Sequence, residues 1–105
     1  MTGTLTLTNF PFRDKLMDRL VREVQYAGPA SYVTGGDSIS GTDDLGSGEV
    51  FGVYGILSDG TNIRVPFWNY TTQKLMLWDP AAGTQAANGA NVSAFTGTLL
   101  FTCKG

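Results

Sequence analysis

The stretch that decides the fold runs from residue 50 to residue 69 and reads VFGVYGILSDGTNIRVPFWN. Apolar residues alternate with other residues on both sides of Asp59-Gly60, and a period of two is the pattern of a β-strand. Asp-Gly suits the positive φ angles of a two-residue type I′ turn. The stretch therefore predicts a β-hairpin in which residues 50–57 pair with residues 61–69.

A two-residue turn also predicts which side chains face each other across the hairpin. One face is strongly apolar, and its pairs are Ile56 with Ile63, Tyr54 with Val65, and Gly52 with Phe67. The other face is mixed, and its pairs are Gly55 with Arg64, Val53 with Pro66, and Phe51 with Trp68. We expect the first face to lie in the core, and the second to be exposed or to meet a partner.

Strand patterns recur on either side of this hairpin. Residues 3–8 alternate threonine with leucine, and residues 74–78 form a short apolar run that ends at Asp79-Pro80. A last strand is predicted from Val92 to Cys103, with inward side chains at Phe95, Leu99, Phe101 and Cys103. We expect the first and last strands to pair with each other.

The remaining segments read as loops or are ambiguous. From Asp14 to Tyr26 the apolar residues fit one face of a helix as well as one side of a strand. Residues 34–48 hold five glycines and predict the longest loop, with Ile39 and Leu45 pointing inward. Residues 81–91 are small and polar, which predicts an exposed loop or arm.

These patterns together predict six or so strands and no long helix. The fold class is therefore all-β, as a small antiparallel β-sandwich, jelly-roll-like or barrel-like, of about six to eight strands. A chain of 105 residues is the size of one domain, so residues 1–105 are expected to share one core. Residues 1–18 are expected to form an N-terminal strand or arm of that domain.

The charge of the chain is low. Seven Lys and Arg residues stand against nine Asp and Glu, for a formal net charge of −2, and only 15 % of residues are charged. Nucleic acids and anionic membranes are held chiefly by clustered basic side chains, so neither is an expected partner. Met1 to Thr8 has neither the basic start nor the apolar run of a signal peptide or a membrane span.

The side chains needed for ordinary enzyme chemistry are scarce. The chain has no histidine and one cysteine, Cys103, which removes the usual general base and zinc sites built from Cys and His. The acids Asp37, Asp43, Asp44 and Glu49 lack the spacing of a calcium loop. A carboxylate pair for glycoside hydrolysis has four possible sources, all typical of turns, namely Asp37, Asp44, Asp59 and Asp79. We therefore predict no enzyme, no catalytic or metal site and no cofactor.

Aromatic residues are the better candidates for function. Trp68, Tyr70 and Trp78 are able to form a platform that stacks sugars or bases, although core burial or a subunit contact explains them as well. Aromatic and arginine side chains are the usual anchors of protein interfaces. The predicted interface residues are Phe51, Arg64, Trp68, Tyr70 and Trp78.

Three short motifs resemble those of small virion proteins of tailed bacteriophages. They are Tyr32-Val33-Thr34-Gly35-Gly36-Asp37, the run from Leu75 to Asp79, and the turn from Ala87 to Ser93. In those proteins a strand leads into a Tyr-x-Thr-Gly-Gly-Asp/Glu turn, and an Ala-Gly/Asn-x-Asn/Asp-Leu/Val-Ser turn precedes the last strand. The resemblance covers about residues 20–104, and residues 1–18 do not match it. It favours a strand over residues 20–27.

The resemblance implies a capsid cement (decoration) protein, or a related minor virion structural protein. Such a protein lies on the capsid exterior, binds the major capsid protein and stabilises the shell. It also implies a homo-oligomer, for which we expect a trimer. The contacts are expected from the loops over residues 28–48 and 81–91 and from one exposed sheet face.

A different class of function is the alternative. The domain would then be a receptor- or carbohydrate-binding module of a head fibre or tail, and would use Trp68, Tyr70 or Trp78. Because stacking requires these rings to share one exposed surface, their positions on the fold discriminate between the two functions.

Overall fold

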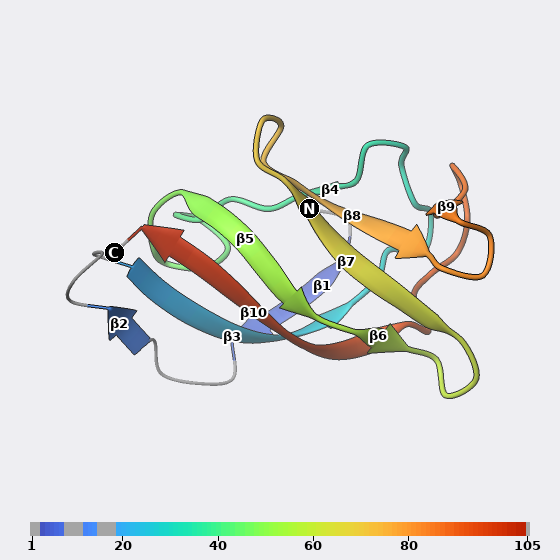
Figure 1. Ribbon diagram of the computed structural model, residues 1–105, viewed down its shortest axis with the longest axis horizontal. Coiled ribbons are helices and arrows are strands. Elements are labelled where there is room, and N and C mark those ends of the chain that lie inside the picture. The colour runs from blue at the N-terminus through green and yellow to red at the C-terminus, as the bar shows by residue number, and fades with distance from the viewer. Residues whose placement is uncertain (1–2, 8–11, 15–18, 105) are drawn as a thin grey trace.

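The computed structural model describes residues 3–7, 12–14 and 19–104, and none of them lies in a helix (Figure 1). The prediction of an all-β fold is confirmed. Ten strands are present, several of them only two residues long, against the six to eight expected. They are β1 (Thr4–Leu7), β2 (Phe12–Asp14), β3 (Arg19–Ala27), β4 (Asp37–Ser38), β5 (Val50–Gly55), β6 (Leu57–Ser58), β7 (Ile63–Asn69), β8 (Lys74–Asp79), β9 (Thr84–Gln85) and β10 (Thr96–Lys104).

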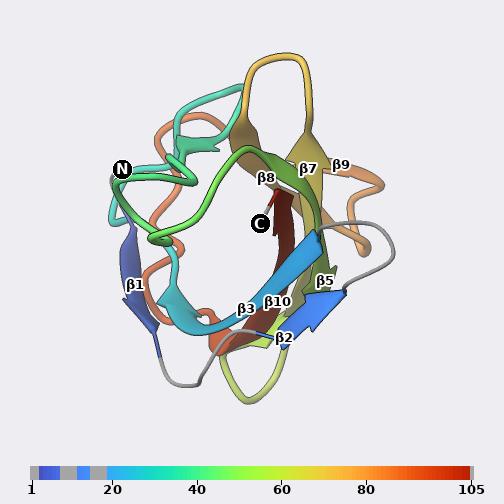
Figure 2. The same cartoon turned by 90° about the vertical axis from the view of Figure 1, so that its left-hand side faces the viewer.

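The strands form one curled, antiparallel sheet in the order β1-β3-β10-β6-β7-β8-β4. β5 pairs with β10, β2 with β3, and β9 with β8. Figure 2 shows the strands and the loops between them as a ring around the core, with β1 on the left, β5 and β7 on the right, and β3 crossing below from one side to the other. β7 makes the corner of the ring, because its first two residues pair with β6 and the rest with β8.

β3 is the strand on which β1 and β10 meet. Leu7 pairs with Val24 from one edge of β3, and Leu99 pairs with Val24 from the other. The prediction that the first and last strands pair is therefore wrong, because nine-residue β3 lies between them. The pairing was missed because a period of two identifies strands but does not show which strands are neighbours. The predicted strand over residues 20–27 is confirmed.

The core lies inside the ring, and the inward side chains expected of the last strand are confirmed. Leu99, Phe101 and Cys103 are fully buried and Phe95 nearly so, although the strand itself begins at Thr96 and not at Val92. Ile39 and Leu45 are also buried, as predicted for the glycine-rich loop. The other large members of the core are Leu20, Val24, Tyr26, Tyr32, Val50, Leu57, Trp68, Leu75, Leu77 and Val92.

The register predicted for the hairpin is wrong by two residues. Ile63 faces Ser58, not Ile56, so Asp59 to Asn62 form a four-residue loop. The Asp59 carboxylate accepts hydrogen bonds from the backbone N–H groups of Thr61 at 2.8 Å and Asn62 at 2.7 Å. An Asp side chain that caps its own turn in this way favours a wider loop than type I′. β5 then pairs with β10 and leaves β7, so only β6 continues the hairpin.

The two faces of the hairpin are also reversed relative to the prediction. Tyr54, Ile56, Ile63, Val65 and Phe67, the large residues expected in the core, are all exposed. On the opposite face, Pro66 and Trp68 are buried and Val53 packs against the core. The reason is the direction of the curl, which places Trp68 edge-on to Phe101 with ring centroids 6.0 Å apart. Alternation defines two faces but does not say which becomes concave.

Two segments differ from the predicted loops. Within residues 81–91, Thr84 and Gln85 form β9 against β8, and Ala86 is buried, so this segment is not a free arm. Asp14 ends β2, while residues 15–18, near the start of the segment whose spacing fits a helix as well as a strand, lie outside the described residues.

Candidate interaction surfaces

Exposed apolar side chains lie on the outside of two neighbouring walls of the ring. Among the described residues nine large apolar side chains are exposed, and seven of them lie here, with exposed fractions from 36 to 65 %. We call this surface the outer face, and its members are Tyr54, Ile56, Ile63, Val65, Phe67, Trp78 and Leu100. β5 and β7, which carry four of the seven, are at the front in Figure 1.

Strand register explains why these side chains gather. Ile63, Val65 and Phe67 occupy every second position of β7, so they point to the same side. Val65 pairs with Trp78 on β8, and Phe67 pairs with half-buried Met76. On the neighbouring wall Tyr54 of β5 pairs with Leu100 of β10. Cross-strand pairing thus extends the apolar row of β7 onto β8, and a second apolar pair lies on β5 and β10.

Two glycines allow β5 and Ile56, the residue that follows it, to lie close against β10. Gly55 has a φ of 140°, and a Cβ there would lie 2.6 Å from the carbonyl oxygen of Thr98. A Cβ on Gly97 would clash with the carbonyl oxygen of Ile56. Only glycine fits both positions without a backbone shift. This close approach keeps Ile56 beside the β10 wall.

Polar side chains border the outer face, and an ion pair between Arg64 and Asp79 lies beneath it. On the β10–β3 side Gln25 donates to the hydroxyl of Thr98 at 2.5 Å. Arg64, a predicted interface residue, points inward: its guanidinium lies 4.3 Å from the centre of the Phe95 ring and 3.4 Å from the Asp79 carboxylate. Arg64 therefore supports the face from below and adds no exposed charge at its centre.

Trp68, also predicted as an interface residue, lies in the core with 9 % of its surface exposed. Its indole N–H donates to the carbonyl oxygen of Val50 at 3.2 Å. The strand register determines which way each tryptophan points. Trp68 faces inward on β7, and Trp78 faces outward on β8 with 43 % of its surface exposed. Of the predicted residues, Trp78 alone belongs to the outer face.

Phe51 and Tyr70 form a separate aromatic pair beside the turn between β7 and β8. Their rings are stacked, with an interplanar angle of 12° and centroids 6.3 Å apart. The Tyr70 hydroxyl donates to Glu49 at 2.5 Å, and this hydrogen bond raises the pKa of Tyr70. Trp68, Tyr70 and Trp78 consequently lie in the core, at a turn and on the outer face, so they do not form the single stacking platform considered from the sequence.

A second surface is built by the two loops predicted to make contacts. They are bound to each other: the N–H of Tyr32 donates to Ala90 at 2.8 Å, the N–H of Gly89 donates back to Tyr32 at 2.6 Å, and the N–H of Val92 donates to Pro29. The Gln85 side-chain oxygen accepts from the Tyr32 hydroxyl and from the N–H of Gly35. We call residues 28–38 and 84–93 the loop pair, whose exposed tips include Val33 and Asn88.

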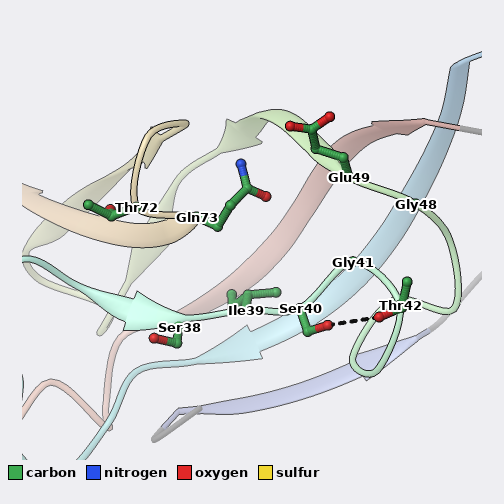
Figure 3. A pocket seen from close by; sticks show the side chains of 9 residues that line it. All are labelled: Ser38, Ile39, Ser40, Gly41, Thr42, Gly48, Glu49, Thr72 and Gln73. Atoms are coloured by element: carbon green, nitrogen blue, oxygen red, sulfur yellow. Dashed lines mark hydrogen bonds between the residues drawn. The ribbon is translucent and has the colours of Figure 1, made fainter.

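A shallow groove of about 450 Å³ lies between the glycine-rich loop and the β7–β8 turn (Figure 3). It is lined by Ser38, Ile39, Ser40, Gly41, Thr42, Gly48, Glu49, Thr72 and Gln73. Its polar groups serve the fold: the Gln73 amide donates to the carbonyl oxygens of Val50 and Tyr70, and Glu49 accepts from Tyr70. The hydrogen bonds of its lining residues therefore hold the β7–β8 turn in place beside the Phe51–Tyr70 pair.

The acids of the glycine-rich loop also have structural partners. Buried Asp37 accepts from the Tyr26 hydroxyl at 2.6 Å and from the N–H of Gly3 at 2.8 Å, which joins the edge strands β1 and β4. Burial, followed by the Asp37 hydrogen bond and charge, raises the pKa of Tyr26. Asp44 accepts from the N–H of Ser40 at 2.7 Å. Within residues 3–7, 12–14 and 19–104, no three His, Cys, Asp or Glu residues are grouped to hold a metal ion.

Cys103 packs as a small apolar side chain, as predicted, and burial raises the pKa of its thiol. A helix long and apolar enough to cross a membrane is absent from the part of the chain that the structure describes. No protein-family model, curated protein or solved structure matches the chain.

Sequence reasoning missed the six other members of the outer face. A signal was present: both faces of residues 63–69 carry large apolar residues, which is unusual for a strand with one side in water. A strand with two apolar faces indicates a second buried contact, outside the core of its own domain.

Proposed function

We propose that this chain is a bacteriophage virion structural protein of the cement type, which binds the capsid exterior and stabilises the shell. The outer face is the observation that carries the proposal. The chain has an accessible surface of 5751 Å², close to the roughly 5,700 Å² of a folded monomer of its mass, so the domain is fully closed around its core. The side chains of the outer face are therefore additional to those of the core and are not core residues that have become exposed.

The size of the outer face supports a contact role. With roughly 150–250 Å² for each complete side chain, its summed exposed fractions correspond to on the order of 500–850 Å². The largest apolar patch on a typical monomer is about 300–600 Å², and larger patches mark interaction sites. A domain with this surface is stable and soluble when the surface is covered in an assembly.

The loop pair gives the domain a second place to bind. Its backbone hydrogen bonds hold two long segments in one conformation, so little conformational entropy is lost when their tips meet a partner. Binding the shell through one surface while another surface meets a neighbour is what a cement protein requires. The motifs that resemble those of virion proteins, over residues 32–37 and 87–93, lie in this loop pair.

The carbohydrate-binding alternative has less support from the geometry. Sugar stacking needs exposed rings on a common surface, whereas Trp68 is buried and Tyr70 and Trp78 lie on different parts of the fold. A glycan array with the purified domain tests this alternative directly. Specific glycan binding that Trp78→Ala abolishes would favour the adhesion module over the cement protein.

Purified virions and expanded capsids test the proposal. We expect many copies of the chain per particle, distributed over the head, and saturable binding of added chain to expanded capsids that lack it. Two variants locate the contact: Asn88→Lys in the loop pair should weaken capsid binding, whereas Thr61→Lys, at an exposed neutral residue outside both loops, should not. A few copies at the tail or vertices, or no binding to capsids, would reject the cement function.

A further inference from the structure

We infer that the outer face binds a second copy of this chain, in a face-to-face dimer about a two-fold axis. The inference rests on the proposed function, since it names the partner of the surface that carries that proposal. It leaves the loop pair as the surface available to the shell. Charge, area and symmetry each support it.

The outer face contains no charged side chain. Its members are three aromatic and four aliphatic residues. Glu23 pairs with Leu100 at the β10–β3 edge of the face, and Arg64 beneath the face forms an ion pair with Asp79 within the chain. Different proteins usually recognise each other through complementary charges, which steer encounter and exclude wrong partners. A neutral apolar surface complements a copy of itself without any such charges.

The area agrees with that of a stable pair. A standard interface buries about 800 Å² per partner, with an apolar centre and a polar rim. The outer face exposes on the order of 500–850 Å², estimated from the size of such side chains. The rim adds Gln25, Thr98 and Ser58, which are exposed beside it. One copy therefore provides an interface of the required size and composition.

The symmetry follows from the presence of one such surface. A two-fold axis joins the same patch on two subunits, whereas a ring of three joins two different patches. The other exposed large apolar residues of the described chain, Val33 and Tyr70, lie on the loop pair and beside Phe51, and neither forms a second patch. This favours a dimer over the trimer that the resemblance implies.

Val65 lies at the middle of the β7 row and gives the sharpest test. Val65→Lys places one positive charge at the centre of each face, so two copies brought together would repel. The matched control is Val33→Lys, the same substitution at an exposed valine outside the face. The neutral variant Phe67→Thr removes a half-exposed ring and keeps a residue that favours strands.

Sedimentation velocity of the full chain over a range of concentrations is the measurement, with circular dichroism to confirm that each variant is folded. We expect wild type and Val33→Lys to reach the mass of two chains. Val65→Lys should remain a folded monomer, and Phe67→Thr should dimerise at least tenfold more weakly. A monomeric wild type, a mass of three chains, or a dimer unaffected by both β7 substitutions would overturn the inference.

Binding to expanded capsids, measured on the same samples, separates this inference from the proposed function. A wild type that is monomeric but binds capsids would overturn the dimer and keep the cement function. A dimer that Val65→Lys dissociates, but that does not bind capsids, would keep the dimer and reject the cement function. Dimerisation together with capsid binding would support both.

Discussion

The inner and outer faces of β7 carry similar residues in opposite situations. Pro66 and Trp68 point inward and are buried, whereas Val65 and Phe67, one position away, point outward and are exposed. Hydrophobicity alone does not distinguish the two sides. The inner side chains stabilise the fold of one chain, and the outer ones become useful only when another molecule covers them. Substitutions on the two faces should therefore affect different measurements.

The two tryptophans provide the largest expected contrast. Trp68→Ala should destabilise the fold by about 3–5 kcal/mol, because it leaves a cavity beside Phe101 and removes the bond to Val50. Trp78→Ala should change monomer stability by less than about 1 kcal/mol and weaken association instead. Urea unfolding of both variants in a monomeric Val65→Lys background measures the difference. Equal losses of stability would break the distinction between the faces.

The glycines beside the outer face offer an intermediate effect. Gly97→Ala should cost about 1–3 kcal/mol, since its Cβ would push against the Ile56 backbone and overpacking of this kind is destabilising. Gly52→Ala is the control, because its Cβ would meet only the Thr102 hydroxyl at an ordinary 3.5 Å. Thermal unfolding compares the two. If Gly97→Ala is as stable as Gly52→Ala, β5 and β10 do not need the close approach described above.

Two tyrosine hydroxyls extend the comparison to polar groups. Tyr26→Phe should cost about 1–2 kcal/mol, because buried Asp37 loses one hydrogen-bond donor. Tyr54→Phe should have almost no effect, since 65 % of Tyr54 is exposed. Chemical denaturation at neutral pH measures both, and a neutral Tyr26→Phe would contradict the role given to the Asp37 contact.

Alkaline pH probes the same buried hydroxyl. Burial raises the pKa of Tyr26 above its ordinary value of 10.0, so the hydroxyl stays protonated in the folded chain where it would ionise in the unfolded chain. The stability linked to this group is complete below pH 10 and is lost as the pH rises above that value. Wild type should consequently lose more stability than Tyr26→Phe above pH 10. Parallel alkaline unfolding curves for the two would contradict this linkage.

The smallest expected effect is at the loop of residues 59–62, which joins β6 to β7. The backbone N–H groups of Asn62 and Thr61 lower the pKa of Asp59, which is fully exposed. A lowered pKa means that the stabilising contribution is present above the ordinary value of 3.8 and is lost as the pH falls below it. Asp59→Asn keeps an acceptor oxygen and cannot ionise, so its stability should depend less on pH between 5 and 2. The same acid dependence in both would exclude this role.

Much of the fold was predictable because it follows from periodicity. The inward residues of the last strand follow from apolar spacing, and the burial of Ile39 and Leu45 follows from their being the large apolar residues of a polar loop. The strand over residues 20–27 did not follow from spacing, which fitted a helix as well; the resemblance favoured it. The register of the hairpin did not follow, because the Asp59 side chain caps the turn and lengthens the loop. The pairing of β5 with β10 and the binding of the two loops to each other depend on contacts between residues distant in sequence.

The candidate site was less predictable than the fold. Trp78 lies on the outer face, whereas Arg64 and Trp68 point to the inner side of β7. Residue type favours arginine and tryptophan as interface anchors, and it does not reveal which way a strand's faces turn. Since both sides of β7 are apolar, only the curl of the sheet assigns Val65 and Phe67 to the outside.

The accessibility of Trp78 tests most directly whether the outer face is covered in an assembly. Trp68 and Trp78 are the two tryptophans of the chain, so Trp68→Phe leaves Trp78 as the one indole reporter. Acrylamide quenching of its fluorescence should fall as the protein concentration rises, and should stay high throughout in a Trp68→Phe, Val65→Lys double variant. Strong quenching of Trp78 at every concentration in both proteins would contradict the account.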